Sequence, residues 1–204
     1  MPADVAIRRL LGGPPRIKAR VAGLLYLLIF IVAPAGASGA TPARMIVTLA
    51  CDTGVAVLFY ELFKPVNRNL SALAAIFRLI LVAMLAIASL NYFGAVDLFQ
   101  GAHDARAFDR LDALSLVPFG IHCLLIGYLV LKAGFLPRFL GVLMAIAGLG
   151  WLTFASPSLA GHLQPYNLVP GVVGEGALTL WLLVVGLDEQ RWLAISARPA
   201  RADT

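Results

Sequence analysis

Charged residues are scarce in this chain. Only 13% of its 204 residues are Asp, Glu, Lys or Arg, whereas 60% are apolar. A soluble domain has about a quarter charged and about half apolar residues, because its surface must face water. This composition cannot supply such a surface, so the sequence predicts a single domain embedded in a membrane.

Cysteine is nearly absent, and so are the motifs of common catalytic and metal sites. The two cysteines, Cys51 and Cys123, both lie in apolar runs, which argues against a disulfide. The chain has no Cys/His spacing typical of a metal site, no glycine-flanked nucleophilic serine, no HExxH pair, no paired aspartates and no glycine-rich phosphate loop. The sequence therefore predicts no metal, no cofactor and no catalytic residue.

The chain carries a surplus of positive charge, with a formal net charge of +5. In a soluble protein this surplus would suggest nucleic-acid binding. Here the basic residues lie beside apolar runs, where they set the orientation of membrane spans and face anionic lipid. We therefore expect membrane lipid as a partner and no nucleic acid.

Six apolar runs dominate the sequence. Each is long enough to cross most or all of a hydrocarbon core of about 30 Å, because a helix rises about 1.5 Å per residue. The expected fold is all-α, a bundle of six transmembrane helices in one membrane domain over residues 21–187. The expected spans are residues 21–37, 45–63, 70–93, 114–131, 139–155 and 171–187.

The basic residues are distributed unevenly over the segments between these runs. Six crossings place both chain ends on one side of the membrane, together with the turns after the second and fourth spans. These four segments hold 12 of the 16 Lys and Arg residues. Because Lys and Arg accumulate in cytoplasmic loops, we expect a basic cytoplasmic leader over residues 1–20 and a cytoplasmic tail over residues 188–204.

The first run permits a second interpretation. A basic region, an apolar core of about 13 residues and the small residues 35–37 also fit a cleavable signal peptide. The run through Ala37 reaches the length of about 17 residues that a span needs. An uncleaved first span is therefore the preferred interpretation, with cleavage as the alternative.

Two expected outer segments differ in character. In residues 94–113, apolar positions recur every three or four residues among charged ones, which predicts a short helix lying at the membrane interface. Residues 156–170 contain three prolines and no Lys or Arg, which predicts an irregular loop.

Several short motifs resemble one membrane family. They are RVAGLLYL at 20–27, LFKPVNRNL at 62–70 followed by FRL at 77–79, GIHCLLIGY at 120–128 and GFLPRFLG at 134–141. Their sequences and order are similar to the bacterial six-span family described as domain of unknown function 4386. The resemblance implies a six-helix architecture and a bacterial membrane protein, and it implies no activity. The segment between the first two spans is shorter here than is usual for the family.

Four ionisable residues lie within the expected spans, where a charged group is costly and needs a partner or a purpose. Asp52, His122 and Glu175 lie about 6–12 Å below the outer interface, and Arg78 lies near the middle of the bilayer, at about 1.5 Å per residue. Three such groups at similar depth predict one outward-facing cavity. The alternative is that Asp52 pairs with Arg78, while His122 only joins neighbouring helices and Glu175 is solvated at the outer mouth.

Two further features of the spans have structural interpretations. Glu61 is nine residues from Asp52, on the opposite face of the same helix, and precedes Lys64 by three residues, which predicts a salt bridge at the inner boundary. Small residues at helical spacing in the fifth span predict a close helix-packing face: Gly141, Ala145 and Gly148.

Three functions fit these observations. The preferred hypothesis is a non-enzymatic protein of the bacterial cytoplasmic membrane that binds, and can move, a small or lipid-like ligand at Asp52, His122, Glu175 and Arg78. The second is a structural or accessory protein whose polar residues only stabilise the bundle. The third is an enzyme acting on a lipid headgroup, with His122 as base. A homodimer is also compatible with the sequence, since six short helices are few for a monomeric transporter.

Overall fold

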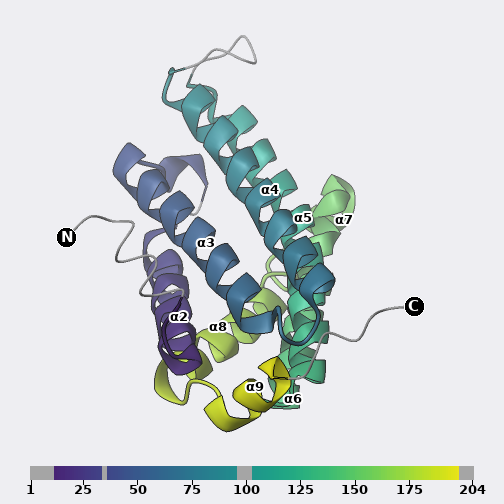
Figure 1. Ribbon diagram of the computed structural model, residues 1–204. Helices are drawn as coiled ribbons and strands as arrows, with labels where there is room; N and C mark the ends of the chain where they lie inside the picture. The colour runs from purple at the N-terminus through teal and green to yellow at the C-terminus, as the bar shows by residue number, and fades with distance from the viewer. Residues whose placement is uncertain (1–11, 34–35, 96–102, 198–204) are drawn as a thin grey trace, which may run out of the picture.

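The computed structural model describes residues 12–33, 36–95 and 103–197, and these are all-helical without strands, as predicted (Figure 1). The short elements are η1 (Ala37–Gly39), η2 (Thr153–Ala155), α7 (Pro157–Leu163) and α9 (Glu189–Ser196). The long helices are α2 (Pro15–Val32), α3 (Pro42–Phe63), α4 (Arg68–Tyr92), α5 (Ala105–Ala133), α6 (Arg138–Leu152) and α8 (Val169–Val184). Each of the six expected apolar runs falls largely on one long helix.

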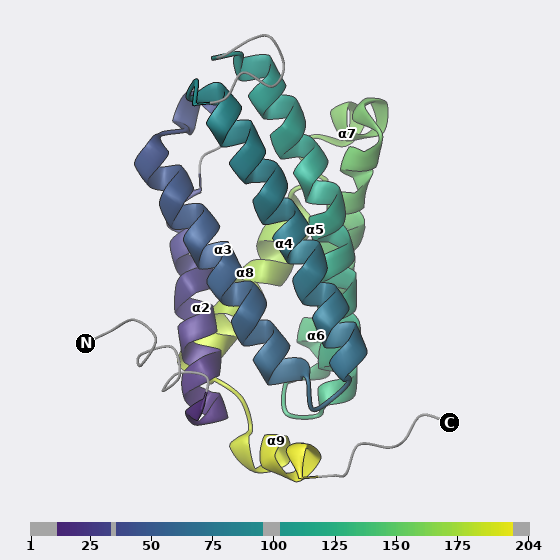
Figure 2. The same ribbon diagram turned by 45° about the horizontal axis from the view of Figure 1, so that its top comes forward.

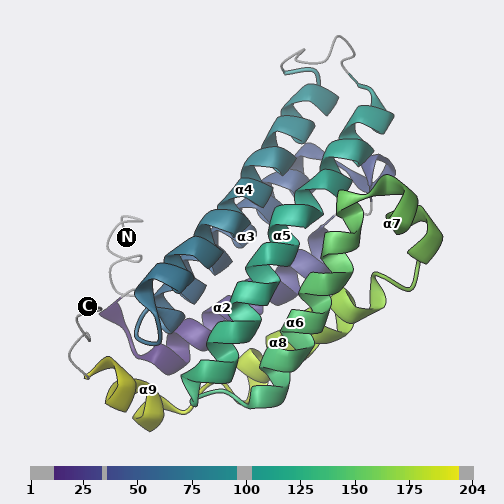
Figure 3. The ribbon, with the colours of Figure 1, turned by 90° about the vertical axis from the view of Figure 1, so that its right-hand side faces the viewer.

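The six long helices form a closed ring. Each packs against the long helices before and after it in the chain, and α8 closes the ring by packing against α2. Successive helices run in opposite directions, so the start of α2 and the end of α8 lie at the same end of the bundle (Figures 2 and 3). One face of every long helix is thereby directed toward a common centre.

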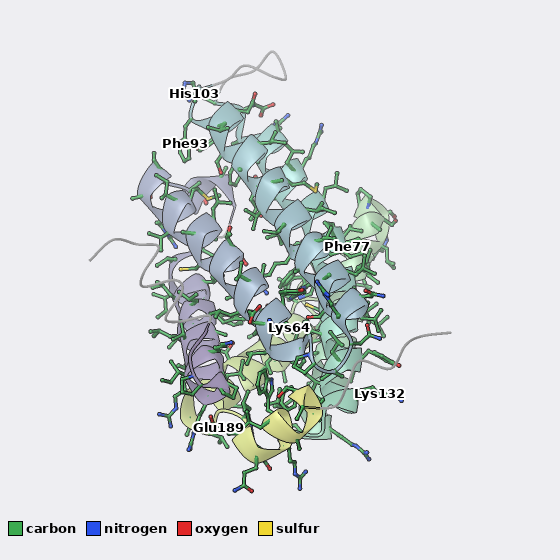
Figure 4. The ribbon with its side chains drawn as sticks, viewed as in Figure 1. Lys64, Phe77, Phe93, His103, Lys132 and Glu189 are labelled. Atoms are coloured by element: carbon green, nitrogen blue, oxygen red, sulfur yellow. The ribbon has the colours of Figure 1, made fainter. Side chains whose placement is uncertain are left out.

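The two ends of the bundle differ in charge. Lys64, Lys132 and Glu189 lie toward one end, and Phe93 and His103 lie at the other (Figure 4). The first end, which we call the basic end, comprises the start of α2, the α3–α4 and α5–α6 turns, and α9. It carries eight described Lys and Arg residues: Arg16, Lys18, Arg20, Lys64, Arg68, Lys132, Arg138 and Arg191.

Four helical segments are long and apolar enough by themselves to cross a membrane: α3, α4, α5, and α6 continued by η2 (Arg138–Ala155). A fifth is reached if α8 and α9, which are bent by 98° against each other, count as one span. The remaining long helix, α2, carries three basic residues among its 18 residues. The chain is thus a membrane-type bundle with four to five candidate spans, and the count of six stays a prediction.

The expected leader and tail are partly helical. α2 begins at Pro15, inside the expected leader, because a proline at the first helical position needs no N–H partner and has a suitable φ. Lys18 is buried there, and its Nζ lies 3.3 Å from Oε2 of Glu61. Glu61 also bonds Lys64 at 2.7 Å, which confirms the predicted boundary salt bridge. Residues 1–11 of the expected leader, 34–35 of the first expected span and 198–204 of the expected tail lie outside the described residues.

The prediction of a separate interfacial helix in residues 94–113 is wrong for the part that the structure describes. Residues 105–113 are the first turns of α5, which continues without a break to Ala133. The Asp104 side chain accepts a hydrogen bond from the N–H of Arg106, and the buried Phe108 packs on Tyr92. These contacts start the helix early and hold it against α4. Residues 96–102 lie outside the described residues.

The prediction of an irregular loop over residues 156–170 is also wrong in part. α7 occupies Pro157–Leu163, and the Ser156 hydroxyl accepts a hydrogen bond from the N–H of Leu159. Pro157 occupies the first helical position after this cap, where proline starts a helix instead of breaking one.

Close packing between α5 and α6 fixes the position of α5 in the ring. A Cβ atom added to Gly127 would lie 2.7 Å from the carbonyl oxygen of Gly141, and one added to Gly148 would lie 2.7 Å from that of Gly120. Only glycine allows the two backbones to approach this closely. The predicted small-residue packing face of the fifth span is confirmed.

Candidate functional site

Polar side chains from all six long helices meet inside the ring. We call these residues the central cluster: Tyr26 of α2, Asp52 of α3, Arg78 of α4, His122 of α5, Trp151 of α6 and Glu175 of α8. It includes all four residues that the sequence indicated. Those four are at most 5% exposed.

The helical period explains why these residues point inward. In α4 the buried residues recur at three- and four-residue intervals, and Arg78 is one of this series. The same holds for Asp52 in α3 and for His122 in α5. Each of these ionisable residues therefore occupies a position that an apolar core residue would otherwise fill.

Arg78 lies in the middle of the central cluster. Its Nε and Nη2 donate hydrogen bonds to Oδ1 of Asp52 at 3.0 and 2.6 Å. Its guanidinium carbon lies 4.4 Å from the ring centre of Tyr26 and 5.2 Å from that of Phe119. The cation is therefore held by one carboxylate and by two aromatic faces. The Asp52–Arg78 pair, which the sequence allowed as an alternative, is confirmed.

The hydrogen bonds of His122 define its tautomer. Nη1 of Arg78 lies 3.2 Å from Nε2 of His122, and guanidinium nitrogens can only donate, so Nε2 accepts. Nδ1 lies 2.8 Å from the carbonyl oxygen of Ala74, which can only accept, so Nδ1 carries the proton. His122 is thus a neutral imidazole whose one free lone pair is directed at a cation. That lone pair is not available to a substrate proton, which argues against His122 as a general base.

Glu175 is held by two donors from other helices. The Tyr26 hydroxyl donates to Oε2 at 3.1 Å, and the Trp151 indole N–H donates to Oε1 at 2.6 Å. Glu175 is 5% exposed, so it is not the solvated outer-mouth carboxylate of the alternative interpretation. These bonds join α2, α6 and α8, as the Arg78 contacts join α3, α4 and α5.

The central cluster is enclosed in this conformation, so an outward-facing cavity at Asp52, His122 and Glu175 stays a prediction. A hollow of about 560 Å³ does exist at the basic end, between α2, the α5–α6 turn and the α8–α9 bend. It is lined by residues such as Arg16, Trp181 and Arg191, and by none of the central cluster. Within the described ranges, no three His, Cys, Asp or Glu side chains are grouped closely enough to hold a metal ion.

Sequence reasoning missed Tyr26 and Trp151. A signal for both was present, because each lies well inside an apolar run, where a buried hydroxyl or indole N–H needs a hydrogen-bond partner. What the sequence could not supply was that partner, since Tyr26 and Glu175 are 149 residues apart.

Comparison with known proteins identifies one family and one relative. The family model described as domain of unknown function DUF4386 matches residues 42–186, from the start of α3 to just beyond α8. An uncharacterized protein of Archaeoglobus fulgidus is 32% identical over 135 residues, which cover 66% of this chain and 76% of that protein. No solved structure matches the chain. The motif at residues 20–27 lies outside the part that the family model matches.

Proposed function

Because this chain belongs to the DUF4386 family, whose description carries no activity, we propose a function from the site alone: a non-enzymatic membrane protein that binds, and moves, a small or lipid-like ligand at the central cluster. The observation that carries the proposal is Arg78, a cation 1% exposed at the centre of a closed helix ring.

The cost of such a group supports a functional role. A charged side chain at the bilayer centre costs about 2.5–3.5 kcal/mol on insertion scales. Replacing a buried ion pair by apolar residues of similar volume is often neutral or stabilising. A ring with an apolar core would therefore be stable without Asp52 and Arg78, so stability alone does not account for their presence.

A second candidate function is a structural one, in which the central cluster only joins the helices. The full hydrogen bonding of His122 and Glu175 by protein groups favours this alternative. The enzymatic hypothesis is not proposed further, because the lone pair of His122 is taken up by Arg78.

Native mass spectrometry of protein released from membranes in mild detergent separates the two candidates. We expect a discrete extra mass on the wild type that is lost from the double variant Asp52→Leu, Arg78→Met. The matched control is Lys18→Met with Glu61→Leu, which removes a partly buried ion pair at the basic end and should keep the extra mass. A bare polypeptide in all three folded samples would favour the structural candidate.

The proposal includes six spans with both chain ends in the cytoplasm of a bacterium, since the basic end then obeys the positive-inside rule. Membrane lipid and a second copy of the chain stay predicted partners. One crossing that needs a test is α8, because its 16 residues count as a span only together with α9.

Single cysteines on either side of α8 provide this test. Ser158 and Ser196 are both exposed, whereas the native Cys51 and Cys123 are buried and should stay unlabelled. In intact cells, a membrane-impermeant maleimide should label Ser158→Cys at once and Ser196→Cys only after permeabilisation. Equal labelling of both variants from one side would show that α8 does not cross the bilayer.

A further inference from the structure

The central cluster contains one more acidic than basic group. Asp52 and Glu175 are its carboxyl groups, Arg78 is its cation, and His122 is neutral by its hydrogen bonds. Asp52 accepts hydrogen bonds from Nε–H and Nη2–H of Arg78. Glu175 belongs to none of the ion pairs that the described residues form. One carboxyl group at the centre of the ring is therefore left without a cation of its own.

An ionised carboxylate without a cation is costly at membrane depth. Two opposing effects act on Glu175. Enclosure in a medium of low dielectric constant favours the neutral carboxyl, whereas the donors Tyr26 and Trp151 stabilise the carboxylate. Neither state is thereby excluded by its surroundings, which is the condition for a group that binds and releases a proton.

We propose that Glu175 is a proton-binding site, which loses a proton from its carboxyl group to become a carboxylate and regains it from water. A metal cation would need several oxygen ligands, but both oxygens of Glu175 already accept an N–H or O–H donor. A proton needs only one lone pair. The Tyr26 hydroxyl can accept as well as donate, so it remains a partner when Oε2 carries the proton.

The other groups that face Glu175 are compatible with this role. The ionisable groups close enough to interact electrostatically with Glu175 are Arg78 of α4, Asp52 of α3 and Cys123 of α5. On its own helix, Thr179 lies one turn further along the same face, 1% exposed, and its hydroxyl has no hydrogen-bond partner among the described residues.

A role for this proton in driving transport rests on the proposed function. Proton binding itself can be measured on the protein without any ligand. The measurement is infrared difference spectroscopy of the purified protein in lipid nanodiscs as the pH is changed. We expect the C=O stretch of a protonated carboxyl group at low pH, lost as the pH rises. The band should be absent from Glu175→Gln and kept in Glu61→Gln, which removes a carboxyl group at the basic end.

A second variant keeps the test decisive if Glu175→Gln does not fold. Glu175→Asp should shift the wavenumber of the titrating band, because the band belongs to that side chain. A band unchanged in the Glu175 variants, or no titrating band in the folded wild type, would overturn the proposal. A titrating Glu175 in a protein that carries no extra mass would retain the proton site and remove the carrier function, so the two failures are distinguishable.

Discussion

Replacing Asp52 by Ala should lower the free energy of unfolding by about 3–5 kcal/mol, because it leaves the guanidinium of Arg78 buried without its carboxylate. The ion pair has an N···O distance of 2.6 Å, and Arg78 is 1% exposed, so bulk water does not reach the guanidinium. Arg78→Met should cost a similar amount, since it leaves the Asp52 carboxylate buried without its cation. Unfolding of the purified protein in mixed micelles measures both losses.

The double variant Asp52→Leu, Arg78→Met should recover most of that loss, since apolar residues of similar size can replace a buried ion pair. It removes both partners, so neither charge is left unpaired. Recovery of stability together with loss of the bound molecule would assign the pair to function. A double variant as unstable as the worse single variant would contradict this and assign the pair to the stability of the ring.

The inward position of the charged residues was predictable from the sequence, and their partners were predictable only in part. Helical periodicity and hydrophobic length identified the six apolar runs and placed Asp52, Arg78, His122 and Glu175 within them. The Asp52–Arg78 pair was predictable because α3 and α4 are joined by a short turn and must be neighbours. The Tyr26–Glu175 bond was not, because it depends on α8 returning to pack against α2 and close the ring.

Helix boundaries were less predictable for a local reason. Residues 105–113 have the pattern of an interfacial helix, but the expected break before residue 114 has no glycine or proline to make it. The helix therefore continues into the membrane-type segment. At Pro15 and Pro157 a helix begins where the sequence predicted none. Proline is unfavourable inside a helix, but it is favourable at the first helical position, which both residues occupy.

Gly171→Ala should be the most damaging single-methyl change near the central cluster. A Cβ atom at this position would overlap the indole of Trp151, with its Nε1 only 2.9 Å away. The indole must move, and it then loses the 2.6 Å hydrogen bond from Nε1 to Glu175. Overpacking and the lost hydrogen bond together should lower the free energy of unfolding by about 2–5 kcal/mol.

Two comparisons assign this loss to Trp151. Gly176→Ala lies on the same helix with nothing within 4 Å of the added Cβ, so it should be neutral or stabilising by up to about 1 kcal/mol. In a Trp151→Phe background, Gly171→Ala should cost much less than in the wild type, because phenylalanine has neither the indole N–H nor its second ring. Unfolding measurements of the four proteins in this cycle give the coupling energy directly. If Gly171→Ala cost as much in the Trp151→Phe background as in the wild type, Gly171 would be needed for a contact other than the one with Trp151. The backbone of α8 would then not be what holds Trp151 against Glu175.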